Sequence, residues 1–182
     1  ISIIYQFRIL FLRVHKNYRL LLILSLLSCS VLAQDQLIFK PDSIKKNLVA
    51  MPIAGAIKVD GVLNEPEWRT APLSSDFTMI EPQQGAAPNF STEIRVLYNR
   101  QFVYFGIFSQ DKEGKSAIRA TDFKRDFNSR QHDHIALHFD GFKDNRNSMT
   151  FVSNAYGVQR DLLSFDDIYY DLDWDGVWKV RT

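Results

Sequence analysis

The chain has 182 residues, of which 46% are apolar and 13% aromatic, a composition that suits one globular domain and not a disordered chain. Its 22 basic and 21 acidic residues give a formal net charge of +1, which provides no long-range field for binding nucleic acid. The single cysteine, Cys29, excludes an intramolecular disulfide, so the core alone must stabilise the domain.

Residues 1–33 have the features of a secretory signal peptide. A basic stretch precedes the apolar run 20–27, and Val31-x-Ala33 resembles a cleavage site. The apolar run is shorter than the roughly 20 residues that cross a bilayer. We therefore expect export to the periplasm, the outer membrane or the extracellular space. An uncleaved anchor and lipidation at Cys29 are the alternatives, and either would attach the protein to a membrane.

The exported part is expected to contain a linker and one domain. Residues 34–52 are polar and mixed in character, which predicts a linker. From residue 53 the chain consists of short apolar segments separated by turn signals, so we assign 53–182 to a single domain. The chain ends at Thr182 in a segment that has the pattern of a strand, and we expect the domain to be truncated at its C-terminus.

The first segment of the domain predicts a strand, a turn and a buried aromatic residue. Residues 57–59 alternate in polarity and predict a strand, and Asp60-Gly61 is a typical turn dipeptide. Pro66 stands near the start of a predicted helical turn. Trp68 follows within this turn, and we expect its indole in the core.

Alternating apolar residues predict the remaining strands. Residues 93–98 and 102–108 flank a polar turn and form the clearest hairpin, and the second of these segments is apolar on both faces, which is typical of a central strand. Further strands are predicted at 134–140, 149–154 and 158–163. Because no long segment has a helical period, we predict an all-β fold, a two-sheet antiparallel β-sandwich of jelly-roll type.

The order and spacing of several short motifs resemble a known family, the family 9 carbohydrate-binding-module-like domain. The resemblance is greatest to the version found at the N-terminus of large bacterial envelope proteins of unknown function. The motifs run from residue 57 almost to the end of the chain: Val59-Asp60-Gly61 to Trp68, Val96-Leu97-Tyr98 with Val103-Tyr104-Phe105-Gly106-Ile107, Arg125-Asp126, 133–140, Phe142-x-Asp144-x-Arg146, Asn154-x-x-Gly157-Val158-Gln159-x-Asp161, and Trp174-Asp175-x-x-Trp178.

The resemblance implies a sandwich that binds sugar with a clamp of two aromatic side chains. One clamp position falls near Arg130, which is not aromatic, and the other lies beyond Thr182. In the envelope proteins this domain precedes a long C-terminal region. The resemblance therefore implies a targeting module of a larger protein, with a role in carbohydrate catabolism.

The residues themselves offer one candidate ligand platform near the end of the chain. Trp174 and Trp178 could stack on the C–H faces of a pyranose ring, and polar side chains would then bind its hydroxyl groups. Candidates for these polar contacts are Gln159, Asp161, Asp175 and Arg130. The alternative is that one or both Trp residues fill the core of the sandwich.

Other chemistry is less well supported by the sequence. Asp171, Asp173 and Asp175 have the oxygen density that calcium prefers, but they lack the later Glu of an EF-hand loop. No nucleophile elbow, phosphate loop or Cys/His dyad is present, so catalysis by this chain alone is not expected. Several charged or polar residues could instead pair with one another to fix loops, namely Arg125, Asp126, Arg146, Asn154 and Asp161.

Three functions therefore remain open from the sequence. The first is an exported carbohydrate-binding-like module of a larger envelope protein. The second is a structural or interaction domain that binds no sugar and packs on its own C-terminal region. The third is the targeting part of a glycoside hydrolase, in which a carboxylate pair about 5–10 Å apart would perform catalysis. An exposed Trp platform would favour the first function, and burial of both Trp residues would favour the second.

Overall fold

The computed structural model describes residues 46–166 and 168–182, which belong to one compact unit, Ile44–Thr182. The predicted signal segment 1–33, with Cys29, lies outside the described residues, as does most of the predicted linker. No helix of the described part is long and apolar enough to cross a membrane.

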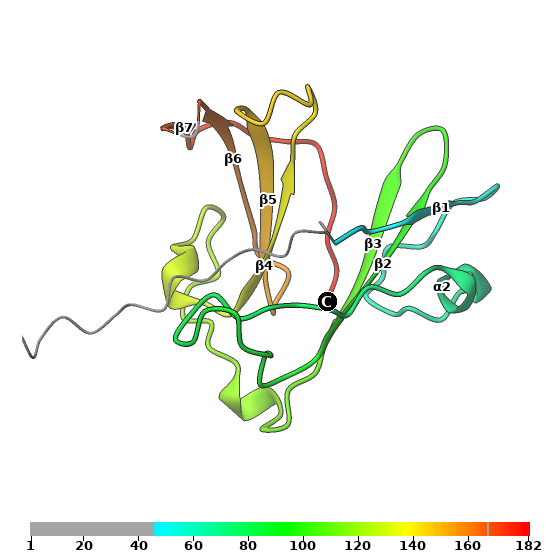
Figure 1. Ribbon diagram of the computed structural model, residues 1–182, viewed down its shortest axis with the longest axis horizontal. Coiled ribbons are helices and arrows are strands. Elements are labelled where there is room, and N and C mark those ends of the chain that lie inside the picture. Colours follow the sequence, from blue (N-terminus) through cyan, green and yellow to red (C-terminus); the bar gives the residue numbers. More distant parts are fainter. Residues whose placement is uncertain (1–45, 167) are drawn as a thin grey trace, which may run out of the picture. The chain divides into compact units, whose positions relative to one another are not determined.

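The described residues form two β-sheets with very little helix (Figure 1), which confirms the predicted all-β class. One sheet has the order β1-β2-β3, with β1 parallel to β2 and β3 antiparallel to it. The other has the order β4-β5-β6-β7, and all its neighbours are antiparallel. The strands are β1 (Ala50–Pro52), β2 (Thr92–Tyr98), β3 (Val103–Ser109), β4 (His134–Phe139), β5 (Ser148–Asn154), β6 (Gln159–Phe165) and β7 (Tyr169–Asp171). The short helices are α2 (Pro66–Thr70), η2 (Lys115–Ala117) and η3 (Ser129–Gln131).

The β2–β3 hairpin forms where the alternation predicted it. Its turn is held by Asn99, whose Oδ1 accepts hydrogen bonds from the N–H groups of Gln101 and Phe102, both at 2.9 Å. The prediction that the second strand is central is wrong for the described residues, because β3 ends its sheet and no strand pairs with its outer edge. The apolar character of β3 on both faces therefore needs another explanation.

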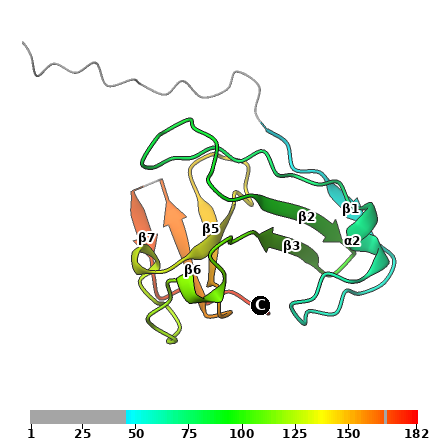
Figure 2. The same cartoon turned by 90° about the horizontal axis from the view of Figure 1, so that it is seen from below.

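Trp68 lies in a core on one face of the first sheet, as the sequence predicted. Helix α2 begins at Pro66, whose fixed φ suits the first helical turn, and it carries Trp68 onto the sheet beside Leu97 and Tyr104. Figure 2 shows α2 next to β1 and the end of β2. Leu97 is 0% exposed, although its neighbours on this face, Glu93 and Arg95, are polar. Both faces of the first sheet thus contact other parts of the domain.

The predicted strand at 57–59 is not formed. Asp60 N donates to Lys58 O at 3.1 Å, and Val62 N donates to Asp60 Oδ1 at 2.9 Å, so the backbone curls locally and does not join a ladder. The side chains of Lys58 and Asp60 also form an ion pair at 3.0 Å. Ile57 still packs against the Trp68 core. The predicted turn at Asp60-Gly61 is present, with Gly61 at φ 87°.

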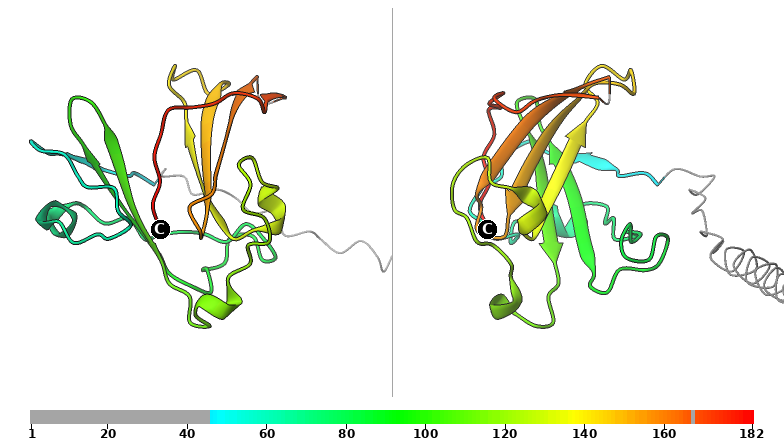
Figure 3. Two further views of the ribbon diagram at one scale, coloured as in Figure 1. Left: turned by 180° about the vertical axis from the view of Figure 1, so that it is seen from behind. Right: turned by 90° about the vertical axis from the view of Figure 1, so that its left-hand side faces the viewer.

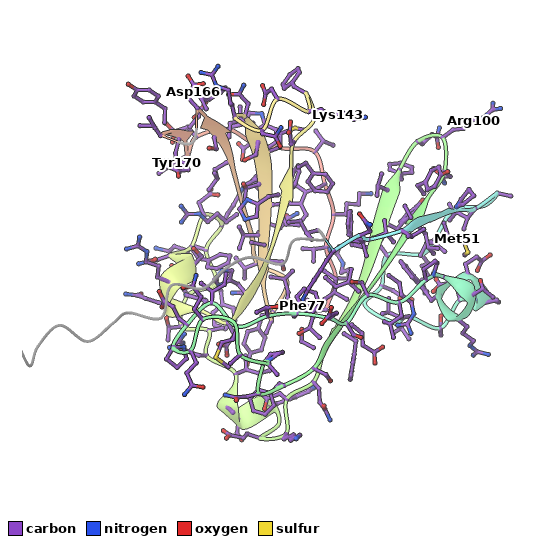
Figure 4. The ribbon with its side chains drawn as sticks, in the orientation of Figure 1. Met51, Phe77, Arg100, Lys143, Asp166 and Tyr170 are labelled. Atoms are coloured by element: carbon purple, nitrogen blue, oxygen red, sulfur yellow. The ribbon has the colours of Figure 1, made fainter. Side chains whose placement is uncertain are left out.

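Strand β1 lies inside the stretch that the sequence assigned to a linker. Ala50, Met51 and Pro52 pair in register with Val96, Leu97 and Tyr98 of β2, a parallel pairing across more than forty residues. The linker prediction is therefore wrong for these three residues. Met51 also packs against the Trp68 core, beside α2 in Figure 4, so the domain begins earlier than predicted.

The second sheet has one face built from aromatic and aliphatic side chains. Phe139 of β4 and Phe151 of β5 meet edge to face with ring centroids 5.6 Å apart, and Phe139 meets Phe105 of β3 at 5.5 Å. The two sheets are therefore in direct aromatic contact. On the opposite face, the buried ring of Phe127 packs on that of His132 at 4.8 Å. The segment after β7 turns back along the sheet and runs to the C-terminus (Figure 3).

Candidate functional site

The candidate site is built around Phe151 on the aromatic face of the second sheet. Trp174 and Trp178, both in the segment after β7, place their rings 5.7 Å and 5.3 Å from that of Phe151. Both indoles are half-buried. The result lies between the two sequence-based alternatives, because neither Trp is a freely exposed platform and neither is enclosed in the core.

Gly176 allows this segment to lie so close to the sheet. A Cβ built on Gly176 would stand 2.7 Å from the Phe151 ring and 2.9 Å from the Trp174 ring, closer than side-chain atoms normally approach. The absence of a side chain therefore lets the backbone between the two Trp residues pass directly over Phe151. This explains why a glycine stands between them.

Asp161 ties the segment to the sheet. It lies on β6 directly across from Phe151, and it is 1% exposed. Its Oδ1 accepts a hydrogen bond from Arg125 Nη2 at 2.6 Å, and its Oδ2 accepts one from the backbone N–H of Gly176. A buried carboxylate needs such charge-assisted partners, since an unpaired buried charge is strongly destabilising. The predicted loop-fixing role of Arg125 and Asp161 is thus present.

Arg125 also reaches the surface through Asp175. Its Nε and Nη2 lie 2.9 Å and 2.7 Å from Asp175 Oδ1, and Asp126 Oδ2 lies 3.8 Å from Nε. Partial burial opposes the charge of Arg125, but the hydrogen bond to Asp175 and the charges of Asp161 and Asp175 outweigh burial and raise the guanidinium pKa. The side chains of Arg125 and Asp175 are 39% and 74% exposed. The residue that follows the half-buried Trp174 in the chain is therefore part of a solvent-accessible pair of a donor and an acceptor.

Gln159 fixes the far end of the segment. Its Nε2 donates to the backbone oxygen of Trp178 at 3.2 Å. The indole Nε1 of Trp178 is buried and has no hydrogen-bond partner among the described residues. Gln159 is therefore committed to the backbone, and its amide can offer a ligand only its remaining hydrogen-bonding capacity.

Five of the six predicted ligand residues come together, and one does not. Trp174, Trp178, Gln159, Asp161 and Asp175 all join the cluster around Phe151.

Arg130 lies apart, exposed on η3, and in the described part of the chain no hydrogen bond or ion pair joins its side chain to this cluster. The basic residue at the site is Arg125 instead. The sequence singled it out only as a loop-fixing residue, because its closeness to Asp175 depends on the fold.

The predicted calcium ligands do not converge. Across 46–166 and 168–182, no three or more His, Cys, Asp or Glu side chains are grouped as metal ligands. Asp171 Oδ1 accepts a hydrogen bond from the N–H of Asp173, and Asp175 is paired with Arg125. Arg146 and Asn154, which the sequence also predicted to fix loops, have partners of their own. Arg146 Nη2 lies 2.5 Å from Asp166 Oδ1, and Asn154 Oδ1 accepts hydrogen bonds from the N–H groups of Tyr156 and Val158.

No family model, curated protein or solved structure matches the chain. The chemistry of the site must therefore be argued from its own geometry. That geometry combines the half-buried indole of Trp174, its contact with the Phe151 ring, and a solvent-accessible pair of opposite charges, Arg125 and Asp175.

Proposed function

We propose that the chain is a non-catalytic carbohydrate-binding-like module whose ligand stacks on Trp174. The single observation that carries this proposal is that Trp174, packed on Phe151, directly precedes Asp175, whose carboxylate pairs with the solvent-accessible Arg125. A pyranose ring presents C–H groups that pack on an indole, and its hydroxyl groups need both donors and acceptors at the edge of that ring. Arg125 supplies the donors and Asp175 the acceptors.

We propose that the two sheets form a β-sandwich of the kind that the family resemblance implies. The edge-to-face contact of Phe105 with Phe139 supports this arrangement, because it joins a strand of one sheet to a strand of the other.

The biological setting is proposed from the leader and the resemblance. The basic and apolar stretches within residues 1–33 support export to the envelope or beyond it. There the module would hold a larger envelope protein on glycans during carbohydrate catabolism. A module of this type would serve equally as the targeting part of a glycoside hydrolase, with the catalytic carboxylates on another domain.

A second candidate function is an interaction domain that packs on a C-terminal region of a larger protein and binds no sugar. Its support is the engagement of the Trp178 backbone by Gln159, together with many large apolar side chains that stay exposed in the described residues. The most exposed of these are Val177, Phe142, Ile80, Ile168, Tyr169 and Phe123.

A glycan-binding experiment separates the two candidates. The folded chain is screened on a glycan array, and any positive sugar is titrated by calorimetry against Trp174→Ala, Trp174→Phe and Tyr170→Ala. We expect Trp174→Ala to weaken binding by about tenfold or more, because a central aromatic anchor is lost. Trp174→Phe keeps an aromatic face and should retain most of the affinity.

Tyr170→Ala is the matched control, because this exposed aromatic lies on β7 and not in the Phe151 cluster. An intact, folded chain that binds no glycan would remove the first candidate and favour the second. Equal losses in Trp174→Ala and Tyr170→Ala would place the sugar elsewhere on the surface.

A further inference from the structure

A buried histidine beside the second sheet is a titratable group that the proposed sugar site does not use. His132, between η3 and β4, is 2% exposed, and its ring packs on that of Phe127, which is 1% exposed. Phe127 stands two residues after Arg125, in the loop that leads to η3. Because the charge of a histidine changes near neutral pH, the surroundings of this ring decide how the loop responds to acid.

Asn154 of β5 determines which ring nitrogen of His132 carries the proton. Its Oδ1 accepts hydrogen bonds from the N–H groups of Tyr156 and Val158, both at 3.0 Å, so its Nδ2 is the amide nitrogen and can only donate. This Nδ2 lies 3.4 Å from Nδ1 of His132. Nδ1 is therefore the acceptor, and the ring is the neutral tautomer with its proton on Nε2.

A second proton on His132 has no acceptor inside the fold. It would bind Nδ1 and point at Nδ2 of Asn154, which is itself a donor. Nε2 is buried and has no hydrogen-bond partner within 46–166 and 168–182. An imidazolium in this pocket would have two N–H groups without an acceptor, so the protonated ring must move out to water.

No nearby carboxylate compensates for a charge on the ring. Asp133, the next residue, directs Oδ2 to a backbone N–H group of the loop at 2.7 Å. Arg160 of β6 binds a carbonyl oxygen of the loop at 2.8 Å, and Arg130 of η3 is also basic. His134 is engaged through Nδ1 by the carbonyl oxygen of His132 at 2.9 Å. In the described part of the chain no ion pair joins His132 to an acidic side chain.

We propose that His132 is a pH switch that holds the loop of Arg125 on the second sheet and releases it in acid. The neutral ring fills the space between Phe127 and Asn154 and keeps the loop closed. An imidazole in water takes up a proton below about pH 6.5, and only the open loop gives the ring access to water. The open state therefore binds one more proton, so the closed loop is stable above about pH 6.5 and is lost as pH falls further.

The switch regulates the candidate site through the position of Arg125. The loop is also joined to β6 by the N–H of Asp126, which donates to Gln159 O at 3.0 Å. When the loop opens, Arg125 leaves Asp161 of β6 and Asp175 of the segment after β7. This step rests on the proposed function: a sugar that binds at the Arg125–Asp175 pair is held at neutral pH and released in acid.

Hydrogen exchange of the full chain measures the switch without any ligand. Peptides that cover residues 125–133 are compared by mass spectrometry at pH 7.5 and pH 5, after correction for the intrinsic exchange rate. Since the open state gains one proton, the opening constant should rise about tenfold for each pH unit below about 6.5, or about thirtyfold at pH 5.

Two substitutions in the pocket separate the switch from general sensitivity to acid. Asn154→Asp keeps an oxygen for the N–H groups of the β5–β6 turn and puts a carboxylate oxygen where Nδ2 was, so it accepts the proton of Nδ1 and the loop should stay closed at pH 5. His132→Gln removes the titrating ring and should give equal exchange at both pH values. His138→Gln is the matched control, because this exposed histidine of β4 lies outside the pocket, and it should keep the wild-type response.

A wild-type loop that exchanges equally at both pH values would overturn the proposal, as would a His132→Gln variant that keeps the acid response. Calorimetry with a bound glycan at the same two pH values tests the consequence for the site. We expect at least about a tenfold loss of affinity at pH 5 in the wild type and none in Asn154→Asp. Acid opening with unchanged affinity would overturn regulation of this site. Acid opening in a chain that binds no glycan at either pH would instead remove the proposed sugar function and leave the switch in place.

Discussion

The indole of Trp68 lies directly on the backbone of Gly106. A Cβ built on Gly106 would stand 2.7 Å from Cζ3 of the ring, so this position in the centre of β3 has room only for hydrogen. The contact joins a residue before the first long strand to the middle of the hairpin. Trp68 thus covers one face of the first sheet, where it packs in the same core as Leu97 of β2 and Tyr104 of β3.

Gly106→Ala is therefore expected to destabilise the domain. The added methyl group must displace the Trp68 ring, and overpacking of this kind costs about 1–3 kcal/mol of the free energy of unfolding. Urea denaturation followed by circular dichroism measures the change. Gly55→Ala is the control, because nothing lies within 4 Å of a Cβ at that position. If both variants lose the same stability, the close approach of Trp68 is not the cause.

Asp161→Asn is expected to destabilise the domain more than Asp175→Asn. Asp161 is buried and accepts hydrogen bonds from Arg125 and Gly176, so loss of its charge should cost about 1–3 kcal/mol. Asp175 meets the same guanidinium but is mostly exposed, and its substitution should cost less than about 1 kcal/mol. Thermal and urea unfolding of the two variants give the comparison, and the reverse order would contradict the tethering role of Asp161.

The loop between β4 and β5 gives a pH-dependent prediction at Asp144. The backbone N–H groups of Asn147 and Arg146, each 2.9 Å from Oδ1, lower the pKa of this carboxyl. Because the folded pKa is lower than the unfolded one, the stability it contributes is present above about pH 4 and is lost as pH falls through the folded pKa. Asp144→Asn should therefore flatten the fall in melting temperature below pH 4.

Asp173→Asn serves as the control for this titration, because the Asp173 carboxylate accepts no hydrogen bond among the described residues. Melting temperatures measured from pH 6 to pH 2 should show a shallower acid slope for Asp144→Asn alone. Identical slopes in the wild type and both variants would mean that the Asn147 and Arg146 contacts do not hold the charged form.

The elements that the sequence predicted well are those with local signals. The β2–β3 hairpin combines strict alternation with a polar turn whose Asn99 binds its own backbone, and both signals lie within a few residues. The same is true of α2, where Pro66 begins the helix and Trp68 is apolar among polar neighbours. The all-β class follows from several such segments without any long-range information.

The features that sequence analysis missed depend on distant partners. β1 exists because Ala50–Pro52 meets β2, and three residues without alternation give no strand signal by themselves. Residues 57–59 do alternate, but the Lys58–Asp60 ion pair and the local backbone hydrogen bonds outweigh that preference. Leu97 is buried because Trp68 of α2 and residues of the segment before it, Met51, Ile53 and Ile57, pack in the same core.

In the candidate site, too, the residues with a local sequence signal could be predicted, and the contacts between distant segments could not. The Trp174-x-x-x-Trp178 spacing identified both indoles, but their shared contact with Phe151 requires the chain to reverse after β7. Arg130 was proposed from a family pattern, whereas Arg125 reaches the site through its ion pairs. A sequence gives residue types and spacing, and the partner of an exposed Arg is decided by which loops meet in the fold.

Gly176→Ala should affect both stability and the proposed sugar binding. The new Cβ would stand 2.7 Å from the Phe151 ring, 2.9 Å from that of Trp174 and 3.1 Å from Asp161 Oδ2, so the backbone must move away from the sheet. We expect a loss of about 1–3 kcal/mol in the free energy of unfolding. The same movement displaces Trp174 from the Arg125–Asp175 pair, so the near-ultraviolet circular dichroism should change and glycan affinity should fall.

Gly141→Ala is the matched control, since its Cβ would meet only the flexible end of Met149 at 3.2 Å. If Gly176→Ala keeps full glycan affinity while its Trp signals change, the ligand does not stack on Trp174.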